Sequence, residues 1–371
     1  MKVALIYDRV NKIGGIERTL GYLHELFPEA PLYTSVYNSR TAPWAEVFKV
    51  IPSFLQKIPF FRKRHELIPY LMPIAFESFS FDEYDIVISV TSEAAKGVLT
   101  KPNTLHLCYC LTPTRYLWSG YEDYFRKPLF RFFSSPLVAY LRRWDRIAAQ
   151  RPDVYLAISE NVKKRIKKYY GRDSEILYPP VDLKKFQISN SKFQTNSKSK
   201  IPNSKYFLLV SRLVSYKRID LVIEAFNQLG LPLKIIGKGI QETILKRKAK
   251  NNIEFLGQLT DKELLGYYQK SQALIFPQEE DFGLVPLEAQ ACGKPVIAFR
   301  GGGALETITA GKTGEFFSPQ TSKALIKVVK NFKAAKYQPE DCRKQAEKFG
   351  KEIFKKKFKE VVENLIKQNQ K

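Results

Sequence analysis

Short apolar runs alternate with amphipathic stretches along the first half of the chain. The apolar runs cover residues 2–7 (KVALIY), 84–90 (YDIVISV), 104–110 (TLHLCYC) and 154–159 (VYLAIS), and helical patterns cover 15–26 and 160–170. Apolar runs of four to eight residues that are separated by helices indicate parallel strands covered on both faces. We therefore expect a doubly wound α/β domain in this half.

The second half repeats the same pattern. Apolar runs at 206–212, 232–237, 252–257, 273–278 and 295–299 alternate with helical stretches at 218–229, 262–271 and 285–292. Two such halves predict two Rossmann-like domains that face each other across a cleft. Ligands of open parallel sheets bind at the carboxyl ends of the strands, so we expect the ligand in that cleft.

A stretch rich in Ser, Asn and Lys separates the two halves. Residues 188–205 read ISNSKFQTNSKSKIPNSK, with too few apolar side chains to offset the entropy of ordering them. We interpret 185–205 as a flexible linker between an N-terminal domain, 1–184, and a C-terminal domain, 206–345. The basic helix that we predict at 346–371 is expected to pack back on the N-terminal domain.

Composition narrows the class of protein. The chain has 371 residues, enough for two cores, and its 61 Lys and Arg against 37 Asp and Glu give a formal charge of +24. This charge suits nucleic acid, an anionic membrane or a phosphorylated substrate. The sequence has no zinc-finger, helix-turn-helix or RNP-like signature, so we expect no nucleic-acid partner. The spacing of the four cysteines predicts reduced thiols, and the absence of a long apolar run predicts a cytoplasmic protein without signal peptide or membrane span.

Two glutamates flank a predicted junction between a loop and a helix. In FPQEEDFGLVPLEAQACGKP, Glu280 lies in the loop and Glu288 one turn inside the helix, which Gly293 would cap. The free backbone N–H groups at the start of this helix favour a phosphate or diphosphate, and they belong to Phe282, Gly283, Leu284 and Val285. Taken alone, the same pattern also fits a solvated loop glutamate followed by a first-turn glutamate that the helix dipole favours.

Two cations precede this junction in the sequence. In LVSRLVSYKRIDLVIEAF, residues 209–226, Arg212 lies just beyond a predicted strand and Lys217 immediately before a helix. A guanidinium and an ammonium at the carboxyl end of a strand can clamp a diphosphate, one by forked hydrogen bonds and one as a point charge. Either cation by itself is more often a solvated surface charge.

These motifs, with GGIE (14–17) and YPPVD (178–182), resemble those of the retaining nucleotide-sugar glycosyltransferases of family GT4, which have the GT-B fold. The stretches CYCLTPTRYLW (108–118) and YLRRWDRIAAQRPD (140–153) are similar to the mannosyltransferase-like branch that builds bacterial O-antigen and capsule. The resemblance covers nearly the whole chain. It implies that Glu280 contacts the donor sugar, that Glu288 contacts the nucleotide ribose, and that Arg212 and Lys217 neutralise the diphosphate.

The resemblance also implies further donor contacts. Gly14 and Gly15 would let the first loop approach the phosphates closely, although an ordinary strand-to-helix turn explains the pair equally well. The base pocket is expected around residues 255–258, which include Phe255, Leu256 and Gly257. The glycine-rich stretch 300–308 would lie near the ribose, with Glu306 as a weaker polar candidate.

Retaining transfer is implied to need no metal, no cofactor and no nucleophile of the enzyme. The acceptor hydroxyl would attack the face that the nucleoside diphosphate leaves, and the departing phosphate would take its proton. Catalysis would then consist of positioning and of charge stabilisation by Arg212, Lys217 and the helix N-terminus. No Asp-x-Asp metal motif is evident in the sequence, in agreement with this implication.

One position departs from the family pattern. Where related enzymes would carry a His beside the donor sugar, this chain has Leu111, which donates no hydrogen bond. His106 lies in the preceding strand, where we expect it to be packed. On the acceptor side the motif keeps Arg115, Tyr116 and Trp118, and Trp118 is expected to stack on a sugar.

Two segments of the N-terminal half interleave cations with aromatic residues. Residues 54–76 carry Lys57, Arg62, Lys63 and Arg64, and residues 125–147 carry Arg126, Lys127, Arg131, Arg142 and Arg143. Cations beside exposed apolar groups suit an anionic bilayer and a lipid diphosphate. The alternative is that the aromatics are core residues and the cations a solvated face.

These features together predict a hexosyltransferase on the inner face of the cell membrane. It would move a hexose, mannose before others, from a nucleotide diphosphate sugar such as GDP-mannose to a lipid-linked or oligosaccharide acceptor in cell-surface polysaccharide synthesis. Leu111 leaves open a catalytically silent relative that acts as a scaffold for nucleotide sugars or lipids. A nicotinamide-dependent dehydrogenase shares the Rossmann halves, but IGGIE (13–17) lacks its G-x-G-x-x-G motif.

Overall fold

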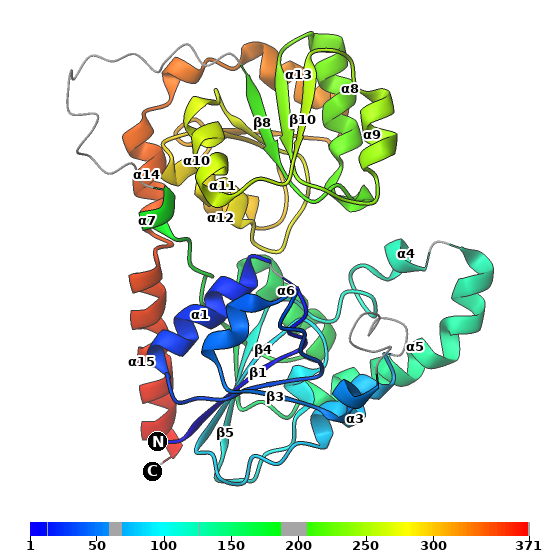
Figure 1. Ribbon diagram of the computed structural model, residues 1–371, viewed down its shortest axis with the longest axis vertical. Helices are drawn as coiled ribbons and strands as arrows, with labels where there is room; N and C mark the ends of the chain where they lie inside the picture. Colours follow the sequence, from blue (N-terminus) through cyan, green and yellow to red (C-terminus); the bar gives the residue numbers. More distant parts are fainter. Residues whose placement is uncertain (13, 59–68, 126, 187–205, 370–371) are drawn as a thin grey trace. The chain divides into compact units, whose positions relative to one another are not determined.

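The computed structural model describes the chain except for residues 13, 59–68, 126, 187–205 and 370–371. Most of the predicted linker, 187–205, therefore lies outside the described residues. The chain divides into two compact units (Figure 1): unit 1 comprises Met1–Pro179 with Phe354–Lys371, and unit 2 comprises Pro180–Ile353. Each unit is a parallel sheet with helices on both faces, the two Rossmann-like halves that the sequence predicts.

Unit 1 contains a seven-stranded sheet in the order β3-β2-β1-β4-β5-β6-β7, with every pair parallel. Its strands are β1 (Val3–Tyr7), β2 (Leu32–Thr34), β3 (Val50–Pro52), β4 (Ile86–Thr91), β5 (Leu105–Cys110), β6 (Val154–Ala157) and β7 (Glu175–Ile176). The chain runs from β1 to one edge and from β4 to the other. The crevice between β1 and β4, where the strand order reverses, is the place where such sheets bind ligands.

The helices of unit 1 cover this sheet. They are α1 (Ile16–Leu26), α3 (Leu71–Glu77), α4 (Tyr121–Tyr124), α5 (Pro128–Ala148), α6 (Glu160–Tyr170) and the short 3₁₀ turns η1 (Pro43–Val47), η2 (Phe54–Lys57) and η4 (Ala95–Gly97). The last helix, α15 (Lys351–Asn369), returns to unit 1, where Phe354 packs on Tyr109 and Phe358 on Phe27. The first turns of α5 extend past the sheet (Figure 1).

Unit 2 contains a six-stranded parallel sheet in the order β10-β9-β8-β11-β12-β13. The strands are β8 (Phe207–Val210), β9 (Leu233–Ile236), β10 (Ile253–Gly257), β11 (Leu274–Phe276), β12 (Val296–Phe299) and β13 (Gly314–Phe317). Here the strand order reverses between β8 and β11. The loops after β8 and β11 therefore flank the switch point of this unit.

Ten helical segments of unit 2 are described. They are α7 (Leu183–Phe186), η6 (Ser215–Lys217), α8 (Ile219–Leu229), α9 (Glu242–Lys248), α10 (Asp261–Lys270), α11 (Leu284–Ala291), α12 (Ala304–Thr307), α13 (Ser322–Asn331), η7 (Ala334–Lys336) and α14 (Pro339–Glu347). Local signals fix several ends: Thr260 and Glu263 form a capping box at the start of α10, and Gly293 follows α11 with φ 73°, as predicted for its cap.

Each unit has its own apolar core. In unit 2 the core lies between the sheet and α8, around Leu209, Val222, Phe226 and Ile275; in unit 1 it includes Ile6, Phe76 and Val87. All four cysteines are buried and free, as expected. Among the described residues, none of the helices combines the length and the apolar character that crossing a bilayer requires.

Candidate functional site

The sequence-predicted cations and carboxylate meet at the switch point of unit 2. Arg212 and Lys217 follow β8, and Glu280 follows β11, the neighbouring parallel strand. Their loops leave the same edge of the sheet side by side. Lys217 is the last residue of η6, and its ammonium donates a hydrogen bond to the Glu280 carboxylate.

The Lys217–Glu280 pair is partly buried and electrostatically matched. The two side chains are 10% and 23% exposed, and Gln278 Nε2 donates to the same Glu280 oxygen at 3.0 Å. Burial raises the pKa of Glu280, but the Lys217 ammonium, the two hydrogen bonds and the Arg212 charge lower it more. Glu280 is therefore an anion at neutral pH, and a carboxylate is a strong acceptor of hydrogen bonds from hydroxyl groups.

Arg212 is the exposed member of the group. Its Nη2 donates to the Tyr216 hydroxyl at 2.7 Å, and the Lys217 ammonium lies 5.2 Å from the centre of the same ring. Tyr216 thus holds both cations beside Glu280. Two positive charges face one carboxylate, so the group carries a surplus positive charge that suits an anionic ligand.

Glu288 lies apart from this group, on α11. Its side chain is buried, and the Tyr268 hydroxyl donates to Glu288 Oε2 at 3.0 Å. The helix begins at Leu284, one residue after Gly283, whose φ of 90° and contact with Phe276 exclude a side chain there. The sequence-predicted helix N-terminus is therefore present, at the end of the loop that carries Glu280.

Glycines allow the loops of this site to touch. A Cβ on Gly239 would lie 2.2 Å from the Leu213 carbonyl oxygen, and one on Gly237 would lie 1.9 Å from that of Ser211. A Cβ on Gly302 would lie 2.2 Å from the Glu280 carbonyl oxygen. Glycines 237 and 239 therefore support the Arg212 loop. The glycine-rich stretch 300–308, expected near the ribose, supports the Glu280 loop.

The other predicted donor contacts lie at separate points of the fold. Phe255 is half-buried against the core of unit 2, and Gly257 ends β10 with φ 69°. In unit 1, Gly14 and Gly15 precede α1, and a Cβ on Gly14 would lie 2.7 Å from the carboxylate of the buried Glu17. The roles of these residues toward a donor remain predictions.

The switch point of unit 1 holds a second charged pair. Arg9 follows β1, Glu93 follows β4, and their side chains form an ion pair. Asp8 accepts hydrogen bonds from Thr91 Oγ1 at 2.8 Å and from the Glu93 and Ala95 amides at 3.0 and 2.9 Å. Burial and the nearby Glu93 charge raise the pKa of Asp8, and the hydrogen bonds from the Ala95 and Ser92 amides partly offset the effect. Asp8 therefore fixes the loop that presents Glu93.

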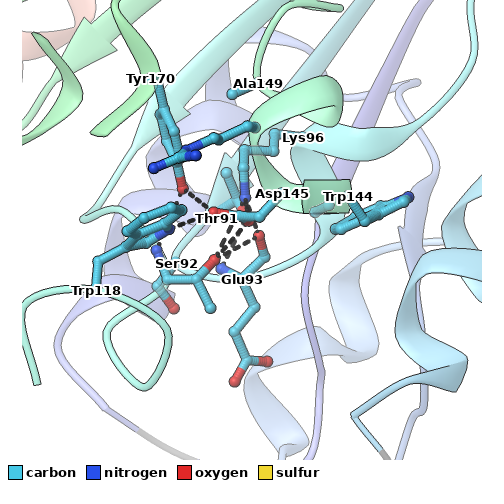
Figure 2. A network of polar contacts seen from close by, with 12 residues as sticks. Thr91, Ser92, Glu93, Lys96, Trp118, Trp144, Asp145, Ala149 and Tyr170 are labelled. Carbon is cyan, nitrogen blue, oxygen red and sulfur yellow. Dashed lines mark hydrogen bonds and ion pairs between the residues drawn. The ribbon is translucent and has the colours of Figure 1, made fainter. Parts of the chain in front are cut away.

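The buried carboxylate of Asp145 is the centre of a hydrogen-bond network in unit 1 (Figure 2). Asp145, near the end of α5, accepts hydrogen bonds from Lys96 Nζ at 2.6 Å, Thr114 Oγ1 at 2.9 Å, Trp118 Nε1 at 2.6 Å and the Tyr170 hydroxyl at 2.8 Å. Burial lowers the pKa of Lys96, but Asp145 raises it more, so the ammonium stays charged. Lys96 also donates to the Glu93 carbonyl oxygen, which ties this network to the Arg9–Glu93 loop.

The network determines where the predicted acceptor residues lie. Trp118 is half-buried: its indole nitrogen bonds Asp145, its ring stacks on Tyr169 with centroids 5.2 Å apart, and Arg146 lies 4.9 Å from its centre. Tyr116 instead lines a cavity with Arg9 and Glu93, and Arg115, the residue before Tyr116, is partly exposed. The structure thus brings Tyr116, not Trp118, to the charged pair of unit 1.

Leu111 and His106 are both buried. The His106 ring bonds the Ser89 hydroxyl at 2.8 Å, and burial, with the charges of Arg151 and Arg172, lowers its pKa to about 3. His106 is therefore a packed, neutral strand residue, as expected. Leu111 is 8% exposed at the end of β5, so it offers an apolar contact where the family pattern predicts an imidazole.

Models of known families match nearly the whole chain. Residues 13–185 match the model described as Glycosyltransferase Family 4, and residues 190–349 match Glycosyl transferases group 1. The first match contains Glu93 and Asp145 of unit 1 but begins after Arg9, and the second contains Arg212, Lys217, Glu280 and Glu288. The chain belongs to glycosyltransferase family 4.

Relatives of this GT4 glycosyltransferase include mannosyltransferases. It is 32% identical to a GDP-mannose-dependent monoacylated alpha-(1-6)-phosphatidylinositol monomannoside mannosyltransferase of Corynebacterium glutamicum, over 42% of this chain and 47% of the relative. It is 24% identical to the O-antigen chain mannosyltransferase C of Escherichia coli over 55% of each chain. The aligned part thus spans about half the length of these relatives.

A solved structure supports the fold over the whole length. The Anabaena protein HepE, in complex with UDP, superimposes with a TM-score of 0.71, covering 98% of this chain and 100% of that chain at 17% identity. Likeness at this identity concerns the fold alone. It agrees with the two Rossmann-like sheets and with the GT-B fold that the sequence predicts.

The sequence did not predict several charged residues of unit 1 in this GT4 glycosyltransferase. Arg9, Glu93 and Asp145 were not predicted, although Arg9 follows the first strand and Asp145 lies within a stretch quoted for its resemblance to the family. A charged residue directly after an apolar run was the signal that could have found Asp8 and Arg9. The predicted cations Arg62, Lys63, Arg64 and Arg126 lie outside the described residues.

Proposed function

We propose that this glycosyltransferase moves mannose from GDP-mannose to a lipid-linked or oligosaccharide acceptor, with retention of configuration and without a metal. Its place would be the synthesis of a cell-surface polysaccharide, at the inner face of the cell membrane. The observation that carries the proposal is the group of Arg212, Lys217 and Glu280 at the switch point of unit 2. Two cations and one carboxylate fit a diphosphate joined to a polyhydroxyl sugar.

The relatives support the choice of sugar and acceptor. One is named as GDP-mannose-dependent and as acting on a phosphatidylinositol mannoside, and another as an O-antigen chain mannosyltransferase. Both names join mannose to a lipid or polysaccharide acceptor. The surplus of basic residues, +24 in formal charge, supports an acceptor that resides at an anionic membrane surface.

In the proposed reaction, an acceptor hydroxyl oxygen bonds to the anomeric carbon while the bond from that carbon to the phosphate oxygen breaks. The acceptor proton moves to the departing diphosphate. Arg212 and Lys217 stabilise the negative charge that develops on the leaving group, and Glu280 accepts hydrogen bonds from sugar hydroxyls. Lys217 can contact both Glu280 and the diphosphate because an ammonium has three donors. Glu288, buried beside Tyr268, would hold the ribose.

Ligand-induced stabilisation and hydrolysis of the donor test this proposal. The purified protein is heated with GDP-mannose, GDP-fucose, UDP-glucose or UDP-N-acetylglucosamine, and we expect the largest rise in Tm with GDP-mannose. We also expect slow release of GDP from GDP-mannose. Stabilisation without release of nucleotide from any donor would favour the silent scaffold, and a preference for a UDP-sugar would contradict the proposed donor.

A further inference from the structure

Unit 1 contains an apolar cavity beside its charged switch point. The cavity has a volume of about 610 Å³, within the range of roughly 300–1,000 Å³ typical of small-ligand sites. Aromatic and aliphatic side chains form most of its wall, among them Tyr116, Phe125, Phe130, Phe133, Leu137 and Leu141. Such a wall offers dispersion contacts and burial of apolar surface, and it offers little hydrogen bonding.

Two charged residues line this cavity. Arg9 and Glu93 belong to the wall, and their side chains are 16% and 17% exposed. Asp8 and Lys96 bond the backbone of Glu93, and these hydrogen bonds fix the position of the Glu93 side chain in the ion pair. An ion pair of this kind presents both donors and acceptors, and therefore suits a polar head group that carries phosphate oxygens and sugar hydroxyls.

Part of the cavity wall belongs to an exposed apolar patch. Four large side chains within one and a half turns of α5 are 58–76% exposed: Leu129, Phe130, Phe132 and Phe133. A cluster of this kind marks a surface that meets an apolar phase. Phe130 and Phe133 belong both to the patch and to the wall of the cavity that Arg9 and Glu93 also line.

We propose that this cavity holds the hydrocarbon chain of the lipid-linked acceptor, with the adjoining phosphate and sugar at Arg9 and Glu93. The proposal rests on the proposed function and adds to it the site and the substrate class. The chain enters past Phe130 and Phe133, and Tyr116 lies where the apolar wall meets the charged pair. Two features carry this choice of occupant: a mostly apolar wall whose charged members, among the described residues, are Arg9 and Glu93, and the two phenylalanines that this wall shares with an exposed apolar patch.

Chain length is the first test. Full burial of one methylene group is worth roughly fourfold in affinity. Binding of geranyl phosphate and farnesyl phosphate to the full-length protein is measured by calorimetry below their micelle concentrations, with inorganic phosphate alone for comparison. We expect farnesyl phosphate, with five more carbons, to bind at least tenfold more tightly than geranyl phosphate. Equal affinity of the two chains would overturn the proposal.

Adjacent residues of α5 provide matched variants. Ser134 lines the cavity, whereas Ser135 is exposed and does not belong to the wall. Ser134→Trp fills the cavity and should weaken farnesyl phosphate binding at least tenfold, and Ser135→Trp should leave it within twofold. Phe133→Ala and Phe132→Ala form a second pair, because both residues are about three-quarters exposed and only Phe133 lines the cavity.

The two proposals fail in different ways. The assignment of the cavity would be overturned if Ser134→Trp and Ser135→Trp lost farnesyl phosphate binding equally. It would also be overturned if neither variant lost it. Stabilisation by GDP-mannose depends on unit 2 and should be unchanged in all four variants, which also shows that they are folded. Absence of donor binding and release in the unchanged protein would count against the proposed function, whatever the alkyl phosphates do.

Discussion

Lys217 and Glu280 lie 63 positions apart in the sequence and form an ion pair at the carboxyl edge of one sheet. Their strands, β8 and β11, are neighbours only because the chain winds away from β8 to one edge and returns beside it. The pair holds Glu280 as an anion before any ligand binds. Arg212 adds a second cation, so the site needs little rearrangement to receive a diphosphate.

Removal of either cation should slow transfer. We expect Arg212→Ala and Lys217→Ala each to lower kcat/KM for the donor by roughly 10²-fold or more, because each removes a charge that stabilises the leaving diphosphate. Lys246, which pairs with Glu242 on the surface of α9, is a matched control, and Lys246→Ala should keep the full rate.

Arg212→Ala tests the proposed diphosphate contact more directly than Lys217→Ala does. Arg212 is exposed and its bond to Tyr216 is at the surface, so Arg212→Ala should unfold at the same urea concentration as the unchanged protein. Lys217→Ala leaves Glu280 without its partner and should also lose stability. Normal rates in both variants would exclude the diphosphate clamp.

The two glutamates should have separable effects. Glu280→Gln keeps the shape of the side chain but lacks the charge, so we expect impaired transfer while GDP still binds. Glu288→Ala leaves the Tyr268 hydroxyl without its buried acceptor and removes the proposed ribose contact, so GDP binding itself should weaken at least tenfold. Calorimetry with GDP and initial rates with the donor measure the two effects. The same loss of GDP binding in both variants would contradict these roles.

Gly239 should be indispensable for donor binding although it carries no side chain. Its substitution by Ala would place a Cβ 2.2 Å from the Leu213 carbonyl oxygen, so the loop that carries Arg212 must move. We expect Gly239→Ala to weaken GDP binding at least tenfold. Gly266, inside α10 with nothing within 4 Å of an added Cβ, is the control, and Gly266→Ala should stabilise the protein by about 0.4–1 kcal/mol. Unchanged GDP binding in Gly239→Ala would show that the loop position is unimportant.

Asp145 should be critical for the stability of unit 1. Asp145→Asn removes the counter-charge of the buried Lys96, and breaking a buried pair in this way costs about 3–5 kcal/mol. Urea unfolding measures the loss. Lys96→Met combined with Asp145→Asn removes both charges and keeps a side-chain oxygen that accepts hydrogen bonds, so it should be less damaging than Asp145→Asn alone.

An exposed aspartate serves as the comparison for Asp145. Asp173 pairs with Lys167 at the surface of unit 1, and Asp173→Asn should leave the urea midpoint unchanged. GDP binding by unit 2 should persist in all these variants. Equal stability of Asp145→Asn and Asp173→Asn would show that the Figure 2 network is dispensable.

Local pattern predicted the strands that lie within apolar runs and missed β2 and β3. Runs such as FLLV and LHLCYC lie in strands where expected, because four or more apolar residues in a row mark a buried strand. The strands β2 and β3 have only three residues each, and nothing in LYT or VIP separates them from a loop. They are strands because they pair beside β1, which is a tertiary cause.

The same distinction applies to the site. The order of cations and carboxylates along the sequence, together with the resemblance to family GT4, was enough to predict Arg212, Lys217 and Glu280 together. It was not enough for Asp145, whose partner Lys96 lies 49 positions away, or for Gly239, whose role is a backbone contact with another loop. For Trp118 the residue type suggested a role that the structure does not show. A tryptophan there suggests stacking on a sugar, but its indole nitrogen donates to Asp145 and its ring stacks on Tyr169.

The start of α5 should anchor the protein to anionic membranes. Lys127 and Arg131 lie there among the exposed Leu129 and Phe132, so cations and apolar groups share one surface. Each cation near an anionic leaflet contributes roughly 1 kcal/mol and is screened by salt, whereas inserted apolar groups resist salt. We therefore expect sedimentation with vesicles that contain phosphatidylglycerol, and only partial release at 1 M NaCl, where the screening length is about 3 Å.

Variants of α5 separate the two contributions to this binding. Arg131→Ser should weaken sedimentation at low salt and leave the salt-resistant fraction unchanged. Leu129→Ser with Phe132→Ser should reduce the salt-resistant fraction, because these side chains are 75% exposed and available to the bilayer. Neither change should alter the stabilisation by GDP-mannose, since α5 belongs to unit 1 and Arg212, Lys217 and Glu280 to unit 2. Equal partitioning of the unchanged protein onto neutral and phosphatidylglycerol vesicles would show that the basic charge serves another partner.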